Sequence, residues 1–217
     1  MQNGYYIVIG AIIAAVFSVL TTFLNSWIAK SKSKNEFKRE HSFKQLKSLY
    51  LSLYGIVAQS EFIRYRYKFD EQYSLMEIPF LEVQNSIKKT IINLKEGIKT
   101  SVSIQESDIT KFNKKALVDL ILEKQEFSSQ KLLKLAVAYR YSHNFYLKDG
   151  LSENQREEHQ LYELVLIYEL VITIIKETNE KLKECDMDYD LNEHDYGVMD
   201  YNIFTTIDEY RQVTNEK

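Results

Sequence analysis

The sequence predicts an all-α protein in which an N-terminal transmembrane helix precedes an antiparallel bundle of about four helices. The first observation is that residues 5–29 contain no charged side chain. An apolar run of this length is long enough for one helix to cross the hydrocarbon core of a bilayer, which takes about 20 residues. The second observation is that the chain has one proline and six glycines, so few residues interrupt its helix-like apolar spacing.

We interpret residues 5–29 as a retained transmembrane anchor and residues 1–4 as a short external N-terminus. A cleaved signal peptide is the alternative, but such a peptide has positive charge before its apolar segment and a small-residue cleavage site after it. Residues 1–4 carry no charge, and residues 23–29 contain no Ala-x-Ala pattern. The run also has aromatic residues at both ends, as is typical where a span meets the headgroup layers.

A basic cluster follows the run and sets the expected orientation. Its members are Lys30, Lys32, Lys34, Lys38 and Arg39, with Glu36 among them. Lys/Arg-rich flanks of membrane spans face the cytoplasm, so we expect a single-pass protein of the cell inner membrane with its N-terminus outside. Residues 30–42 then form a basic juxtamembrane stalk. The single cysteine, Cys185, agrees with a reducing cytoplasm, because it has no partner for an intramolecular disulfide.

Charge is distributed unevenly along the chain. Residues 30–47 carry seven Lys/Arg and two Glu, whereas residues 185–217 carry nine Asp/Glu and two Lys/Arg. The basic segment adjoins the membrane, where each cation near anionic lipid contributes about 1 kcal/mol. We therefore expect anionic lipid as a partner of the stalk. Nucleic acid is a poor candidate, because the rest of the chain is acidic.

Four helices are expected in a cytoplasmic bundle that spans residues 43–184. The first starts near Phe43 and has an apolar stripe with alternating steps of three and four residues. Because no breaker separates it from the anchor, we expect the two to form one continuous rod. Further helices are expected at 80–98 after Pro79, at 108–147 with a bend near residues 127–129, and from Ser152 to Glu184.

The helix that starts at Ser152 has the clearest signal. Ser152 and Gln155 have the spacing of a capping box, in which two side chains satisfy free backbone N–H groups. Residues 161–175 are apolar nearly all round, which is typical of a central helix that is buried on most sides.

The segment 185–217 is interpreted as an acidic tail. Phe204, Ile207 and Tyr210 have the spacing of a short amphipathic helix that packs back on the bundle. Its aspartates resemble the start of a calcium loop, but Leu191 and Gly197 occupy the positions of the required glycine and glutamate. We therefore predict a solvated acidic loop, no metal site and no cofactor.

Three polar residues form a candidate site. Arg140 and His143 lie close together in one expected helix, and Glu169 lies in the apolar part of the last one. A carboxylate is costly to bury unless it is paired, and Arg64, Arg66 or Arg140 can supply a partner. A structural ion pair and a hydrogen-bonded histidine at the edge of the core are the simpler interpretations. We assign no catalytic residue.

The anchor has a face of small side chains that recurs every fourth residue. Its members are Gly10, Ala14, Ser18 and Thr22. Faces of this kind allow membrane helices to approach closely and associate. A homo-oligomer is therefore one alternative, and the stripe from Phe43 can extend it as a parallel coiled coil.

The layout of residues 5–54 resembles a loose group of uncharacterised small bacterial membrane proteins. The similarity lies in an anchor, a Lys/Arg-rich helix start at residues 30–39 and a Leu/Tyr-rich segment at residues 46–50. Members of such groups often occur with mobile elements or phage defence, and the resemblance assigns no catalytic residue.

Three functions follow from these patterns. We expect an interaction or scaffold module that holds a protein partner at the inner face of a bacterial membrane. One alternative is a membrane-tethered effector or enzyme, for example in phage defence, with its site near Arg140, His143 and Glu169. Another is a ligand sensor that signals by dimerisation.

Overall fold

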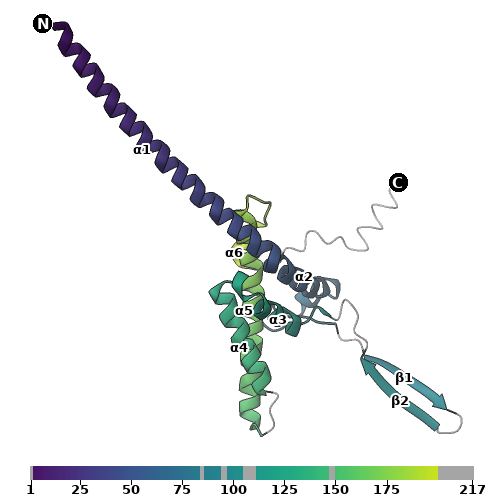
Figure 1. Ribbon diagram of the computed structural model, residues 1–217. Helices are drawn as coiled ribbons and strands as arrows, with labels where there is room; N and C mark the ends of the chain where they lie inside the picture. The colour runs from purple at the N-terminus through teal and green to yellow at the C-terminus, as the bar shows by residue number, and fades with distance from the viewer. Residues whose placement is uncertain (1, 84–85, 94–96, 105–110, 147–149, 200–217) are drawn as a thin grey trace, which may run out of the picture.

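The computed structural model describes residues 2–83, 86–93, 97–104, 111–146 and 150–199. A long N-terminal helix projects from a helical body, and a β-hairpin extends from another side of that body (Figure 1). The helices are α1 (Gln2–Gln45), α2 (Leu51–Arg66), α3 (Lys114–Glu123), α4 (Gln130–Tyr146), α5 (Glu153–Glu184) and α6 (Leu191–Tyr196). The strands are β1 (Ser86–Asn93) and β2 (Gly97–Ile104). The prediction of a mainly helical bundle is confirmed.

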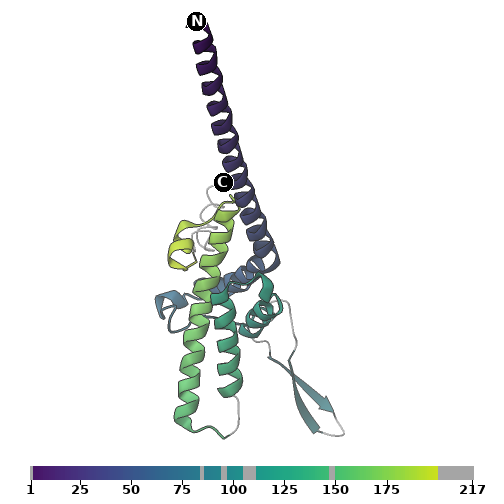
Figure 2. The ribbon, with the colours of Figure 1, turned by 60° about the vertical axis from the view of Figure 1, so that its left-hand side comes forward.

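Residues 2–66 form one uninterrupted helical segment, as the lack of breakers predicted. A single π-helical turn, η1 (Leu46–Tyr50), joins α1 directly to α2. π turns of this kind often bend a helix, and the chain changes direction near this turn (Figure 2). Leu46, Leu49 and Tyr50 are buried, so the bend lies inside the core.

α1 stands apart from the body over most of its length. Its side chains are described from Ser18, and those described between Ser18 and His41 are exposed. Ser42 is the first buried residue. At 1.5 Å per residue the 44 residues of α1 span about 66 Å. Figures 1 and 2 show this helix leaving the body as a single arm.

α5 is the central helix of the body. It packs against α1, η1, α2, α4 and α6, and Ile167, Leu170, Val171, Ile174 and Ile175 are all at most 1% exposed. The predicted capping box at its start is present, with Ser152 and Gln155 bonded reciprocally. The predicted burial of this helix on most sides is found only in its middle part, residues 167–175.

The outer face near the start of α5 differs from that prediction. Leu161, Tyr162 and Val165 are exposed, because no described element covers this side of the helix.

The helix predicted at residues 80–98 is wrong. The segment contains β1, which pairs antiparallel with β2, and Ser86 faces Ile104 while Asn93 faces Gly97. Both strands are rich in β-branched residues, which favour extended backbone. Spacing of three and four was present in the sequence, but intrinsic preference decided the outcome. The all-α prediction therefore needs this hairpin as a correction.

The helix predicted at residues 108–147, with a bend near residues 127–129, is two helices that are separated close to that bend. α3 ends at Glu123, a short 3-10 turn, η4 (Gln125–Phe127), follows, and α4 begins at Gln130. The Ser129 hydroxyl accepts a hydrogen bond from the Leu132 N–H at 3.0 Å, so it caps the new helix. Asn113 caps α3 through the Ala116 N–H. Residue 108, where this helix was expected to begin, lies outside the described residues.

The residues predicted to form a short helix at the end of the tail, Phe204, Ile207 and Tyr210, also lie outside the described residues. The described part of the tail instead contains α6, which is capped by Asp190 and packs on α5.

In the part of the chain searched, which is limited to described residues, no helix combines the length and apolarity needed to cross a bilayer. The described side chains of α1 begin at Ser18. Gly10 and Ala14, the first two positions of the predicted small-residue face, precede these described side chains.

Candidate functional site

The three residues of the predicted polar site do not meet. Glu169 forms an ion pair with Lys131 at 3.6 Å, and both side chains are partly exposed. The partner is therefore a lysine rather than one of the arginines considered from the sequence. Arg140 is exposed on α4. His143 turns instead toward Glu163 of α5, with Nδ1 at 3.3 Å from Oε1.

His143 belongs to a cluster that joins α4 to α5. The Tyr139 hydroxyl donates a hydrogen bond to Glu163 Oε1 at 2.9 Å, and its ring stacks on His143. Burial first, and then the charge of Glu163, raise the pKa of Tyr139 well above its ordinary value. This tyrosine therefore keeps its proton, and its bond to the carboxylate holds the two helices together.

A cavity of about 330 Å³ opens beside this cluster. Lys114 and Glu77 supply charge at its edge, while Phe80 and Ile167 supply apolar surface. The titratable lining residues Glu77, Lys114, His143 and Glu163 come from four different segments, and we assign no reaction to this cavity.

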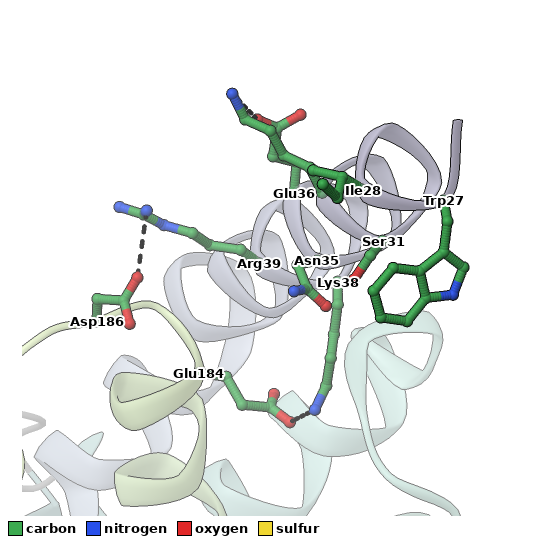
Figure 3. Close-up of a pocket in the computed structure, with 10 residues that line it drawn as sticks. Trp27, Ile28, Ser31, Asn35, Glu36, Lys38, Arg39, Glu184 and Asp186 are labelled. Carbon is green, nitrogen blue, oxygen red and sulfur yellow. Dashed lines mark ion pairs between the residues drawn. The ribbon is translucent and has the colours of Figure 1, made fainter. Parts of the chain in front are cut away.

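A larger pocket lies where α1 meets the C-terminal end of α5, and we call it the junction pocket (Figure 3). Its volume is about 720 Å³. Its lining residues are Trp27, Ile28, Ser31, Lys32, Asn35, Glu36, Lys38, Arg39, Glu184 and Asp186. Three members of the predicted basic cluster line it: Lys32, Lys38 and Arg39. Lys30 and Lys34 are exposed outside it.

Glu184 is the central acceptor of the junction pocket. Its Oε1 lies 3.0 Å from Lys38 Nζ, and its Oε2 accepts hydrogen bonds from Ser42 Oγ at 2.5 Å and Lys181 Nζ at 2.9 Å. Burial raises the pKa of Glu184, but the hydrogen bonds from the hydroxyl and the two ammonium groups outweigh burial and lower that pKa to about 2. The side chain is therefore a carboxylate at neutral pH and ties the stalk to α5.

A second ion pair lies beside the first. Arg39 Nη1 is 3.3 Å from Asp186 Oδ2, and the Cys185 thiol donates to the Arg39 carbonyl at 3.8 Å. Burial raises the pKa of Cys185, so the thiol keeps its proton and its reactivity is low. Asn35 lies on α1 between the two ion pairs (Figure 3).

Replacing Glu184 with glutamine is expected to lower the free energy of unfolding by about 1–2 kcal/mol at pH 7, because hydrogen bonds to a charged group are lost. The folded-state pKa is lowered, so this contribution is complete above the ordinary carboxylate pKa of about 4.5 and disappears as pH falls toward 2. Chemical denaturation of the full chain in mild detergent at pH 7 and pH 3 measures the difference.

Glu158→Gln is the matched control, because Glu158 is an exposed residue of the same helix. It should change the free energy of unfolding by less than about 0.5 kcal/mol. An effect of Glu184→Gln that is equally small, or that does not shrink in acid, would contradict the assigned role.

Glu193 of α6 is a further carboxylate with several partners, and the sequence did not identify it. It is 4% exposed and accepts hydrogen bonds from the Tyr54 hydroxyl at 2.8 Å and the Asn179 amide at 2.8 Å. Burial and then the bond to Glu193 raise the pKa of Tyr54. The available signal was the spacing of Asp190 and Glu193, which is typical of a helix start.

No protein-family model matches this chain, and it has no match among curated proteins or solved structures. The resemblance of residues 5–54 to small bacterial membrane proteins therefore stays a prediction.

Proposed function

We propose that the chain is a membrane-anchored interaction module whose helical body is held at the cytoplasmic face of a bacterial inner membrane. One observation carries the proposal: α1 projects from the body, and its large apolar side chains are exposed. Leu20, Phe23, Leu24, Trp27 and Ile28 are each more than half exposed. They continue the uncharged run that starts at residue 5.

An apolar helix surface of this kind needs a cover. Soluble monomers rarely expose contiguous apolar patches larger than a few hundred Å², and each large apolar side chain gains about 1.5–3 kcal/mol on burial. A bilayer covers all sides of the helix at once, whereas a protein partner covers one side. Because the run has no charged side chain on any side, lipid is the better cover.

The basic stalk supports the proposed orientation. Lys30, Lys32 and Lys34 are exposed immediately after the run, and cations at this position favour the cytoplasmic side. Their exposed side chains are placed to contact anionic headgroups.

The interaction role is supported by the surface around α6. Leu191 and Tyr196 are 60% and 70% exposed, and the exposed residues Asp188 and Asp195 lie close to them in the sequence. Exposed apolar and aromatic side chains with charged neighbours are typical of protein interfaces. The favoured partner is therefore a protein with a basic rim around an apolar patch.

Two arginines in the anchor test the tether. The variant Phe17→Arg/Leu20→Arg places two charges near the middle of the run, at a cost of about 2.5–3.5 kcal/mol each in a bilayer. The wild-type chain should stay in the membrane fraction after alkaline carbonate extraction, and the variant should leave it. Vesicle flotation of the purified chain measures the same property.

The control is Phe37→Arg/Tyr141→Arg, which adds the same charge at two exposed positions outside the run. It should stay in the membrane. Extraction of the wild-type chain by carbonate would exclude the tether.

The same preparations test the interaction role. After solubilisation in mild detergent, the wild-type chain should retain a stoichiometric protein partner that Leu191→Asp/Tyr196→Asp loses. Both positions are exposed, so the variant is expected to fold. Recovery of the wild-type chain alone would count against an interaction module.

A further inference from the structure

We propose that the junction pocket binds the headgroup of a phospholipid that carries both a phosphodiester and a primary ammonium group. This proposal rests on the proposed tether, because the tether brings the pocket to the bilayer surface. It goes beyond general attraction of the stalk to anionic lipid, because it assigns a defined pocket and one headgroup chemistry.

The two sides of the pocket differ in the groups that they offer. α1 supplies hydrogen-bond donors from Asn35, Lys38 and Arg39, while Glu184 at the end of α5 and Asp186 just after it supply two carboxylates. Glu36 of α1 also lines the pocket and is paired with Lys32 at 4.0 Å. In Figure 3 Lys38 and Arg39 extend from α1 toward Glu184 and Asp186, with Asn35 between them. A phosphate fits the donor wall, and an ammonium group fits the carboxylate wall.

The size of the pocket suits a headgroup. Its volume of about 720 Å³ lies within the range of about 300–1,000 Å³ that is common for small-molecule sites. Trp27 and Ile28 line it and belong to the uncharged run, so they give the acyl chains apolar surface that continues along α1.

Apolar groups precede charged groups along α1, as acyl chains precede the headgroup in a phospholipid. Trp27 and Ile28 come first, and the donors at residues 35–39 follow, beside the carboxylates of Glu184 and Asp186. Phosphate and ammonium are adjacent in a headgroup, as the donors and carboxylates are adjacent here. Asn35 lies about 9 Å along the helix from Ala29, so long lysine and arginine side chains reach the headgroup layer.

The ligand enters by exchanging partners with an existing ion pair. Arg39 and Asp186 are 60% and 78% exposed, and exposed ion pairs contribute little to stability. The phosphate replaces Asp186 as the partner of Arg39, and the ammonium group replaces Arg39 as the partner of Asp186. The less exposed Glu184 keeps its bonds to Ser42 and Lys181 and remains a fixed wall.

This chemistry discriminates among headgroups. A trimethylated ammonium group has no N–H to donate to the carboxylates. A glycerol headgroup leaves the phosphate charge unbalanced beside two carboxylates. The ethanolamine headgroup supplies both the phosphate and three N–H donors, so it is the one we expect to be retained.

Native mass spectrometry of the full chain in detergent tests the proposal. The protein is mixed with equal amounts of phosphatidylethanolamine, phosphatidylcholine and phosphatidylglycerol that share the same acyl chains. Ethanolamine lipid should be retained about tenfold over choline lipid, because charge-assisted hydrogen bonds distinguish them. Trp27 is the single tryptophan and lines the pocket, so its fluorescence should shift with the ethanolamine lipid.

Two variants localise the effect. Arg39→Gln and Asp186→Asn should each bring the ethanolamine-to-choline ratio close to one. Asp186 has a positive φ of 55°, a conformation that asparagine accepts, so the second variant is expected to fold. Lys47→Gln removes an exposed cation outside the pocket and should leave the ratio at its wild-type value.

Equal retention of ethanolamine and choline lipid, or preference for the glycerol lipid, would overturn the proposal. So would a Trp27 shift produced as strongly by free O-phosphoethanolamine, because that result would identify a soluble ligand. Failure of the tether gives a different pattern, since the chain would then not float with vesicles of any composition.

Discussion

Replacing Arg64 with methionine is expected to lower the free energy of unfolding by about 3–5 kcal/mol, because it leaves the Glu61 carboxylate buried without its counter-ion. Arg64 Nε lies 3.0 Å from Glu61 Oε2, and both side chains are 2% exposed. Arg64 also donates a hydrogen bond to the Ile78 carbonyl. The pair therefore holds the chain after α2 against that helix, and chemical denaturation followed by circular dichroism measures its loss.

The double variant Glu61→Gln/Arg64→Met separates the buried charge from the packing. It removes both charges, so it should be more stable than Arg64→Met alone by about 1–3 kcal/mol. A double variant that is less stable than the single one would show that the charge left on Glu61 is not the source of the loss.

Replacing Gly197 with alanine is the second large effect and should cost about 2–4 kcal/mol. Gly197 has a φ of +70°, which side chains rarely adopt, and it ends α6. A Cβ at this position would lie 2.6 Å from Ile172 Cγ2 and 3.0 Å from the Ile172 carbonyl oxygen. The substitution therefore forces α6 away from α5, which denaturation and hydrogen exchange of α6 will detect.

Gly55 supplies a control of opposite sign. It lies within α2, and a Cβ there would meet nothing within 4 Å. Gly55→Ala should stabilise the chain by about 0.5–1 kcal/mol, because alanine loses less conformational entropy in a helix. If both substitutions destabilised the protein equally, close packing at Gly197 would not be the cause.

The long helices were predictable because their signals are local. The stripe after Phe43 and the capping box at Ser152 lie within a few residues of the structure that they determine. The absence of breakers between Ala29 and Phe43 likewise predicted the continuous rod. The π turn was not predictable, because it follows from how Leu46 to Tyr50 pack in the core.

The hairpin was missed because the same residues have helical spacing and a preference for extended backbone. Phe80, Val83, Ile87 and Ile91 have helical spacing, but Ile87, Ile91, Thr90 and Ile92 are also β-branched. Strand pairing needs a second segment, and β2 supplies it across the whole length of β1. A helix prediction based on β1 alone does not include that partner.

Only the basic residues of the junction pocket could be predicted from the sequence. The basic cluster is visible in the sequence, but Ser42 and Glu184 are 142 positions apart, and no local pattern joins them. The acidic segment after Glu184 was interpreted as a separate tail. Its first aspartate in fact pairs with Arg39, because the end of α5 returns to the base of α1.

The unbroken helix from α1 into the body sets the distance between the uncharged run and the body as well as their direction. From Ala29 to Ser42, the first buried residue among the described side chains, the helix rises about 20 Å. If residues 5–29 lie in a bilayer, as we propose, the body is confined to a thin layer below the membrane and turns with its anchor. Under that proposal, encounters with other membrane-bound proteins would take place at a raised effective concentration, so a weak contact surface would be sufficient for association.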